Sequence, residues 1–201
     1  MGYDFTPNTD NLNNLVVAVN DLGKMLEDFI KDLKGFTGIT LEVKDKFRPG
    51  RDPLATDWYD FYPYFVQSCE LNLILQFKGS ILSKGNTLVY AKAKLDQLPA
   101  CCGVCILNSV EIHSDLRGNG IGKEFVKTAE AFAKVLNYSY VMCTTHKVNG
   151  PAIGVVECLG YTELDSGFVN MRTKNSIRMF GKNLNPAGKS LTDGYLDLKE
   201  N

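Results

Sequence analysis

The sequence predicts an α/β protein with a mixed, mostly antiparallel sheet. After an N-terminal helix pattern come several strand patterns, a strand–helix–strand–helix stretch follows, and short strand patterns close the series. The strand predicted at 104–112 leads through a helix to the strand at 138–144. Because such crossovers are right-handed, these two strands are predicted to lie parallel in the sheet.

The first predicted element is a long amphipathic helix over residues 9–34. Thr9 or Asp10 can cap its start, Gly35 can end it, and Gly23 inside it costs about 1 kcal/mol relative to alanine. The apolar residues of this helix recur at spacings of three and four and form one stripe along it, which must be buried either on the chain's own domain or against a second subunit or partner protein. The residues of the stripe are Leu12, Leu15, Val16, Val19, Leu22, Leu26, Phe29, Ile30 and Leu33.

Strands and a polar loop follow this helix. Residues 39–43 alternate between apolar and polar side chains, which predicts a half-buried strand. Residues 45–57 contain two prolines and a glycine and predict a loop. The aromatic-rich run 58–65 is either core or the lining of a substrate pocket. Further strands are predicted at 71–77, 87–94, 104–112 and 138–144, with two short ones at 162–164 and 168–173.

Two more helices are predicted in the second half of the chain. Residues 120–136 share an apolar face, and Pro151 favours the start of a short helix over 151–159. The sequence becomes polar from about residue 175. We therefore expect an N-terminal helix (1–36), a core domain (37–175) and a polar C-terminal tail (176–201).

Charge and hydropathy narrow the possible partners. The net charge of −1 and pI of about 6.1 argue against a protein that binds duplex DNA through phosphate charge. A local basic stretch at 44–51 leaves nucleic acid open as a partner; it contains Lys44, Lys46, Arg48 and Arg51. The sequence shows neither a secretory signal nor an apolar stretch of membrane-spanning length, so we expect a cytoplasmic protein without membrane contact.

The six cysteines fit this expectation. In a reducing cytoplasm they remain thiols, and buried thiols behave as small apolar side chains. Cys102 and Cys105 form a CxxC pair, but no second pair at similar spacing completes a zinc site. No metal is therefore predicted.

The most informative stretch is the glycine-rich turn between the strand at 104–112 and the helix that follows. Gly118, Gly120 and Gly122 allow the backbone to approach a ligand closely, and the amides of the first helical turn point outward at the positive end of the helix dipole. This combination predicts a site for an anion, most naturally a phosphate.

Two common phosphate-binding motifs do not fit the turn. A Walker loop needs GxxxxGK followed by Ser or Thr, but only three residues separate Gly118 from Gly122 and Glu124 replaces the hydroxyl. A dinucleotide fingerprint needs GxGxxG and an acidic residue about twenty positions later, and residues 138–142 contain no acid.

The turn instead resembles the acyl-CoA pyrophosphate loop of the GNAT N-acetyltransferase family. Arg117-x-x-Gly120-x-Gly122 matches that loop. Asn149-x-x-Ala152 followed by Leu159-Gly160-Tyr161 resembles the family's next helix motif. The resemblance covers roughly residues 104–173 and implies a splayed pair of parallel strands, flanked by helices, that admits acetyl-CoA.

The resemblance also implies which residues bind acetyl-CoA. The loop amides would hold the pyrophosphate, the strand before the loop would pair with the pantetheine arm, and Asn149 would contact that arm. The Ile112 amide would polarise the thioester carbonyl. The expected acetyl-CoA-binding residues are Val110, Ile112, Arg117, Gly118, Asn119, Gly120, Ile121, Gly122, Lys123, Asn149 and Ala152.

The proton donor for the leaving thiolate departs from the family pattern. Many members carry a tyrosine seven residues after the motif asparagine, and this position is Val156 here. Cys158 and Tyr161 are the nearby alternatives, although Tyr161 also occupies the family's packing aromatic position.

Several side chains are candidates for the base that deprotonates the amine. His146, between the second splayed strand and the next helix, and His113, just after the first, both suit this chemistry. Asn108 can orient a water molecule. Strand alternation places Asn108 on the face of Ile112 and directs Glu111 to the opposite face.

Two functions follow from the sequence. The first is an N-acetyltransferase that moves an acetyl group from acetyl-CoA to an amine by direct attack in a ternary complex. The second is a GNAT-fold protein without catalysis that binds or supports a larger assembly, such as a viral one. In either case the helix at 9–34 is available for a homo-oligomer or partner contact.

Overall fold

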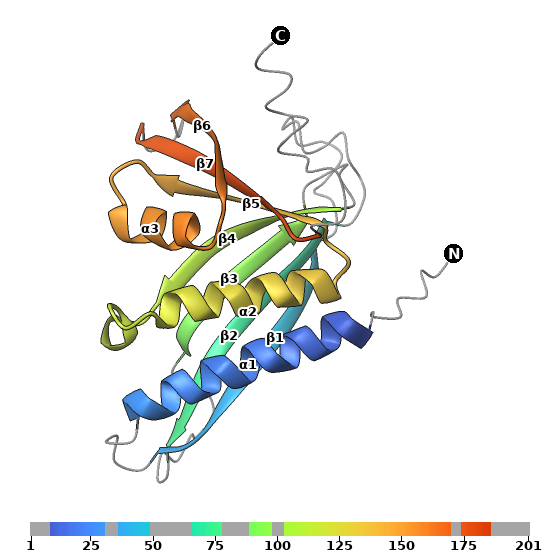
Figure 1. The fold of residues 1–201 in the computed structure, drawn as a ribbon, viewed down its shortest axis with the longest axis vertical. Coiled ribbons are helices and arrows are strands. Elements are labelled where there is room, and N and C mark those ends of the chain that lie inside the picture. Colours follow the sequence, from blue (N-terminus) through green and yellow to red (C-terminus); the bar gives the residue numbers. More distant parts are fainter. Residues whose placement is uncertain are drawn as a thin grey trace.

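The computed structural model describes residues 9–30, 36–48, 66–77, 89–97, 103–169 and 174–185. These residues form one seven-stranded sheet in the order β1-β2-β3-β4-β5-β7-β6 (Figure 1). All neighbouring strands are antiparallel except β4 and β5, which are parallel, so the predicted mixed α/β fold is confirmed. The strands are β1 (Phe36–Arg48), β2 (Val66–Phe77), β3 (Val89–Gln97), β4 (Val104–Ile112), β5 (Tyr140–His146), β6 (Thr162–Val169) and β7 (Ser176–Asn183).

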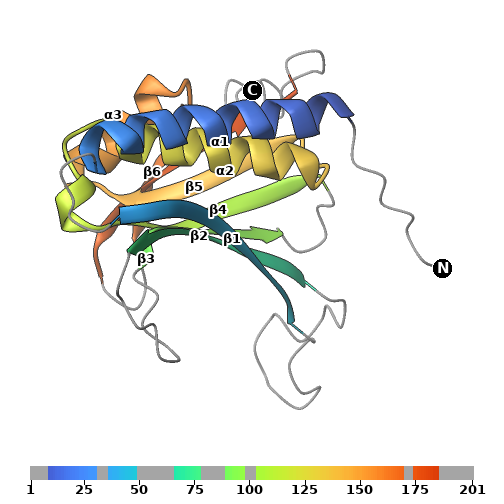
Figure 2. The ribbon, with the colours of Figure 1, turned by 90° about the horizontal axis from the view of Figure 1, so that it is seen from below.

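Two long helices cover one face of the sheet. These are α1 (Thr9–Ile30) and α2 (Ile121–Val135), which lie side by side on the same side of β1 to β4 (Figure 2). They run antiparallel, because Asn11 Nδ2 donates to the carbonyl of Lys134 at 3.0 Å and Thr128 Oγ1 donates to the carbonyl of Ala18 at 3.4 Å. The short helix α3 (Gly150–Cys158) follows β5.

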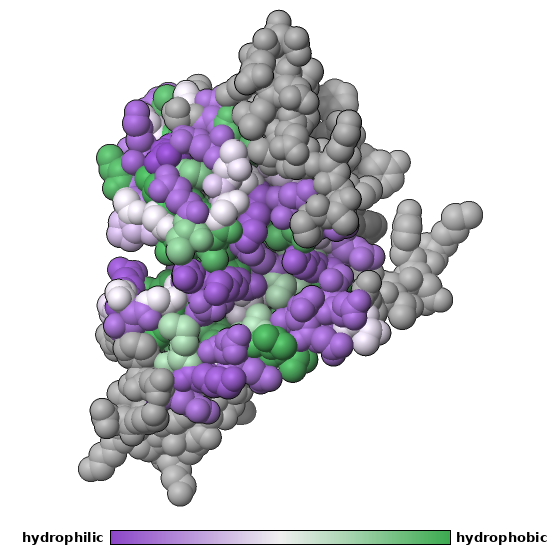
Figure 3. Space-filling view, viewed as in Figure 1, coloured by the Kyte–Doolittle hydropathy of each residue, from purple (hydrophilic) through white to green (hydrophobic). Residues whose placement is uncertain are grey.

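The apolar core lies between the sheet and these helices. Leu22 and Leu26 on α1, Phe125 on α2, and Leu71 and Leu73 on β2 are all buried in it. Polar residues alternate with the buried ones along β2 and β3, so those strands turn a polar face away from α1 and α2. The predicted stripe on the first helix is only partly buried, because Leu12 and Val16 stay exposed, as does the neighbouring Val17. Figure 3 shows an apolar patch on the surface over α1.

Three elements differ from the sequence prediction. β1 continues to Arg48 where a loop was expected, because residues 45–48 pair with β2 from Cys69 to Val66. Residues 176–183 were assigned to the polar tail, yet they form β7 between β5 and β6. Residues 162–169 form one continuous strand, where two short strands were expected at 162–164 and 168–173, and residues 170–173 lie outside the described residues. In each case, cross-strand hydrogen bonds stabilise a segment whose own composition is too polar to indicate a strand.

Some predicted features lie outside the described residues. They are the aromatic run 58–65, Cys101, Cys102, Arg51 and the end of the first helix at 31–34. Within the described ranges, no helix is long and apolar enough to cross a membrane. The same ranges contain no group of three or more His, Cys, Asp or Glu residues suited to hold a metal ion.

Candidate active site

The glycine-rich turn forms a compact loop between β4 and α2. A single 3-10 turn at Ser114–Leu116 starts it, and the buried Leu116 side chain anchors it in the core. Gly118 and Gly120 have φ angles of +81° and +78°, a left-handed conformation that side chains with a Cβ rarely adopt. The two glycines are therefore required by the backbone path of the loop.

The loop presents backbone donors at the start of α2. Gly120 is the N-cap of α2 and makes no side-chain cap hydrogen bond. The first amides of a helix lack intrahelical partners and carry the positive end of the helix dipole. The backbone geometry on which the predicted phosphate site depends is therefore present, while binding of a phosphate stays a prediction.

Beside the loop, β4 separates from β5. The two strands pair only from Val104–Leu107 to Tyr140–Cys143, while β4 continues to Ile112 and β5 to His146. The His113 amide donates to the Tyr90 carbonyl on β3 at 2.7 Å. By alternation, the Ile112 amide points the other way, toward the open edge of β4. The molecular surface is hollowed between the part that carries α3 and the part that carries the loop (Figure 3).

A β-bulge in β4 changes which side chains share a face. Lys92 of β3 pairs with Glu111, but Lys94, two residues later, pairs with Asn108, three residues earlier. Ser109 lies in this bulge with a φ of +52°. Asn108 and Glu111 therefore lie on the same face of the sheet, and the expectation that Glu111 points away from Asn108 is wrong. Simple alternation fails because the bulge adds one residue to β4 only.

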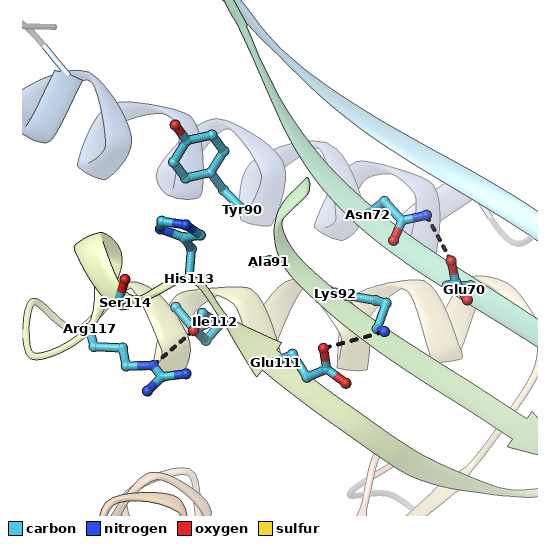
Figure 4. A pocket seen from close by; sticks show the side chains of 10 residues that line it. All are labelled: Glu70, Asn72, Tyr90, Ala91, Lys92, Glu111, Ile112, His113, Ser114 and Arg117. Carbon is cyan, nitrogen blue, oxygen red and sulfur yellow. Dashed lines mark hydrogen bonds and ion pairs between the residues drawn. The ribbon is translucent and has the colours of Figure 1, made fainter. Parts of the chain in front are cut away.

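A cavity of about 650 Å³ lies on this polar face of the sheet (Figure 4). Glu111 Oε2 is 3.3 Å from Lys92 Nζ, and its side chain is 65% exposed. The His113 and Tyr90 rings lie together, with centroids 4.9 Å apart. Arg117 donates from Nε to the Ile112 carbonyl at 2.8 Å, which links the cavity to the loop. β2 contributes Glu70 and Asn72 to the lining.

Comparison with known proteins identifies the family. The model of the acetyltransferase (GNAT) family matches residues 54–161, just over half of the 201 residues. The chain belongs to the GNAT acetyltransferase family. No curated protein matches it in sequence.

Solved acetyltransferase structures resemble the chain at low sequence identity. An acetyltransferase (GNAT family) from Bacillus anthracis is 11% identical, with a TM-score of 0.46 over 57% of this chain and 66% of that one. An IAA acetyltransferase from Bacillus cereus is 13% identical, with a TM-score of 0.45 over 71% and 99%. The ribosomal-protein-S18-alanine N-acetyltransferase from Escherichia coli is 16% identical, with a TM-score of 0.44 over 61% and 74%.

The GNAT motif residues at the start of α3 stabilise the beginning of that helix. Asn149 is the N-cap of α3, and its Oδ1 accepts from the Ala152 amide at 3.3 Å. Pro151 lies at the start of this helix, as expected. Val156, at the position where many GNAT proteins carry tyrosine, is buried in the core.

The predicted catalytic residues are dispersed. Asn108 lies beside the cavity face and donates to Asp96 Oδ2 at 3.4 Å. His146 is exposed at the end of β5 and is not among the residues that line the cavity, whereas His113 is. Tyr161 is 6% exposed in the core. Burial, with Glu130 nearby, strongly raises the pKa of its hydroxyl.

The residues of β2 and β3 that line the cavity were not predicted from the sequence. Asn72 and Lys92 belong to segments whose pattern indicates a strand and nothing more. A buried asparagine inside an apolar run was the one local signal, because buried polar side chains usually have a specific partner.

Proposed function

We propose that this GNAT protein is an N-acetyltransferase that moves an acetyl group from acetyl-CoA to a primary amine in a ternary complex. One observation carries the proposal. The uncapped glycine loop, the open edge of β4 and the Glu111 carboxylate are joined within one strand–loop–helix unit. Together they offer an anion site, a backbone edge and a base.

The residues present fit an acyl-CoA thioester. The amides from Gly118 to Gly122 would hold the pyrophosphate, because they combine left-handed glycines with the start of a helix. The Lys123 amide already donates to the Gly120 carbonyl at 3.0 Å, so Lys123 would contribute its ammonium group. Val110 and Ile112 would offer the edge of β4 to the pantetheine arm. Asn149 would contribute its side-chain NH₂, since its oxygen already caps α3. Acetyl-CoA, when bound, supplies the acetyl group as a thioester, and no metal is needed for this transfer.

The chemistry then falls to groups along β4. The Ile112 amide would stabilise the negative charge that develops on the carbonyl oxygen during attack. The Glu111 carboxylate would accept the proton that the attacking nitrogen loses. The new C–N bond forms as the C–S bond breaks, and the sulfur leaves as a thiolate that takes a proton from water or from a donor such as Cys158. Asn108, held by Asp96, would orient the amine or a water molecule.

Location and partners follow from the same proposal. The described cysteines Cys69, Cys105, Cys143 and Cys158 are free thiols, which suits the reducing cytoplasm expected from the sequence. The predicted contact through the helix at 9–34 stays a prediction. Light scattering of the full chain measures it, and the exposed Val16 on α1 is the residue to replace by Lys.

A second function is favoured by Val156. Its burial at the usual tyrosine position removes a common proton donor, as expected for a GNAT-fold protein that binds acetyl-CoA without transferring the acetyl group. Titration calorimetry with acetyl-CoA, followed by an assay of acetyl transfer to a panel of amines, separates these cases. Binding with turnover supports the enzyme. Binding without turnover supports the alternative, and no binding at near-millimolar acetyl-CoA contradicts the enzyme.

The first prediction concerns Glu111→Gln. Glutamine keeps the size of the side chain but cannot take the proton, so kcat/KM for the amine should fall by about 10²-fold or more at pH 7. Glu27→Gln, at an exposed carboxylate on α1, is the matched control and should keep the activity. Steady-state kinetics with both variants decide the matter. A Glu111→Gln enzyme within twofold of wild type would remove Glu111 as the base.

A further inference from the structure

A row of polar side chains crosses four strands next to the proposed base. Glu42 on β1 pairs with Asn72 on β2, Asn72 pairs with Lys92 on β3, and Lys92 pairs with Glu111 on β4. Directly opposite residues of antiparallel strands project to the same face. We call these four residues the cross-strand row.

The cross-strand row contains one acceptor without a partner. Asn72 is 1% exposed, and its Nδ2 donates to Glu70 Oε1 at 3.1 Å and to Glu42 Oε2 at 3.5 Å. Its Oδ1 is buried and has no hydrogen-bond partner in the described part of the chain. A buried carbonyl oxygen without a donor is costly, so such atoms are rare unless they have a use.

Lys92 is the donor nearest to that oxygen in the strand register. Its Nζ lies 3.3 Å from Glu111 Oε2, in an ion pair that is partly open to solvent. Asn72 is its direct neighbour on β2, and the Asn72 oxygen points toward the Lys92 side (Figure 4). Side chains of directly opposite residues start about 5 Å apart, a distance that the flexible lysine stem spans easily.

We propose that Lys92 is a two-position counter-ion that selects protonated amines as acceptors. Without acceptor it neutralises Glu111. When an alkylammonium group reaches the cavity, that group takes the place of Lys92 beside Glu111, and the Lys92 ammonium donates to Asn72 Oδ1. Glu111 then holds the nitrogen and takes one of its ammonium protons, which frees the lone pair for attack, and the second proton, released when the C–N bond has formed, goes to water or to the leaving thiolate. Lys92 and Asn72 are positioning residues in this scheme, which rests on the proposed role of Glu111.

The replacement of Lys92 by the acceptor determines which class of amine the cavity accepts. A cation that replaces Lys92 pairs with the Glu111 carboxylate in its turn, whereas a neutral amine would leave both charges of this partly exposed pair to water alone. Aliphatic primary amines are cations at neutral pH, whereas arylamines are neutral there. The cavity therefore selects aliphatic amines over arylamines, and the buried Asn72 oxygen lowers the cost of the exchange by accepting the displaced ammonium.

Nuclear magnetic resonance of the full-length protein tests the exchange without any turnover. Correlated ¹³Cε–¹⁵Nζ lysine signals are recorded, and the Lys92 signal is assigned by its loss in Lys92→Met. Propylammonium should shift the Lys92 signal in the wild type, and aniline should not. In Asn72→Leu, which is similar in shape but lacks the oxygen, the shift should be strongly reduced. An unmoved wild-type signal, or an equal shift in Asn72→Leu, would overturn the proposal.

Steady-state kinetics add a second test, because a purely structural role of Lys92 would not lower KM while kcat is retained. Lys92→Met removes the competing cation, so KM for an alkylamine should fall by up to about fivefold with kcat retained, as a partly exposed ion pair is worth little more. Asn72→Leu should raise KM instead, and a thermal melt confirms that this variant is folded. An increased KM in Lys92→Met contradicts the exchange. If no amine is acetylated, the proposed function fails while the resonance experiment still decides the exchange.

Discussion

Ser109 is the residue that determines which groups meet in the cavity. Its φ of +52° is uncommon for a non-glycine residue, and such conformations concentrate at functional sites. The bulge at this position brings Asn108 and Glu111 to one face, opposite Lys94 and Lys92. One additional backbone residue thus places a carboxylate beside the open edge of β4.

Tyr161 offers a clear test at the residue scale. Its hydroxyl is buried without a hydrogen-bond partner among the described residues, and burial raises its pKa far above neutrality. We expect Tyr161→Phe to keep kcat within about twofold and to change stability by less than about 1 kcal/mol, because the lost oxygen makes no hydrogen bond. Steady-state kinetics and chemical denaturation measure both. A loss of kcat of about 10²-fold would instead identify Tyr161 as the proton donor.

The cysteines should differ sharply in reactivity. Burial raises the pKa of the Cys105 and Cys143 thiols to about 12, so almost no thiolate is present at pH 7, while Cys158 is exposed. Iodoacetamide should label Cys158 at least about tenfold faster than Cys105 or Cys143. Peptide mass spectrometry over a time course measures the rates, with Cys158→Ser as the control. Equal rates would mean that the core opens readily.

At the scale of elements, α1 supports the glycine loop as well as the core. A Cβ on Gly120 would lie 3.4 Å from the Met25 methyl group. Because α1 and α2 run antiparallel, the C-terminal half of α1 meets the start of α2, where the loop amides lie. The N-terminal helix therefore packs against the loop that is proposed to hold the pyrophosphate.

Gly120→Ala tests this arrangement. The left-handed φ of Gly120 costs alanine about 1–2 kcal/mol, so the loop should shift. We expect affinity for acetyl-CoA, measured by calorimetry, to fall by about tenfold, which corresponds to about 1.4 kcal/mol. Gly23→Ala in α1 is the control, because nothing lies within 4 Å of its added Cβ. That control should raise stability by about 1 kcal/mol and leave the affinity unchanged.

At the scale of the whole molecule, ion pairs connect the C-terminal strands to the rest of the fold. Lys182 on β7 donates to Glu130 on α2 at 2.6 Å, and the Glu130 side chain is almost fully buried. Arg178 on β7 binds Glu163 on β6 with two hydrogen bonds, of 2.8 and 2.6 Å. Residues near the end of the described chain are thus tied to the central helix and to the neighbouring strand.

The Arg178–Glu163 pair predicts an acid dependence of stability. Hydrogen bonds from Arg178 lower the pKa of Glu163, so the folded state binds its proton less readily than the unfolded state does. The stabilisation is present above the ordinary carboxyl range, about pH 4, and is lost as the pH falls through the lowered pKa. Glu163→Gln should therefore lose less unfolding free energy than wild type between pH 7 and pH 3. Urea denaturation at both values measures this, with the more exposed Glu157→Gln as control.

The sequence predicted the elements whose signals are local. The positive φ angles of Gly118 and Gly120 required glycine, and the turn with its following amphipathic helix was recognisable without knowledge of any contact with distant parts of the chain. The parallel relation of β4 and β5 followed from a general rule of chain handedness. β7 could not be predicted in the same way, because its polar residues form a strand only between β5 and β6.

The tertiary structure alone decided which residues form the proposed acceptor side of the site. The sequence determined the loop proposed for acetyl-CoA, because backbone conformation and helix termini depend on neighbouring residues. Lys92 and Glu111 meet through strand register, and Glu111 reaches the cavity face only through the bulge at Ser109. Register and bulges depend on hydrogen bonds between distant segments, and a one-residue shift reverses the face of every side chain that follows. No pattern within β4 could reveal that shift.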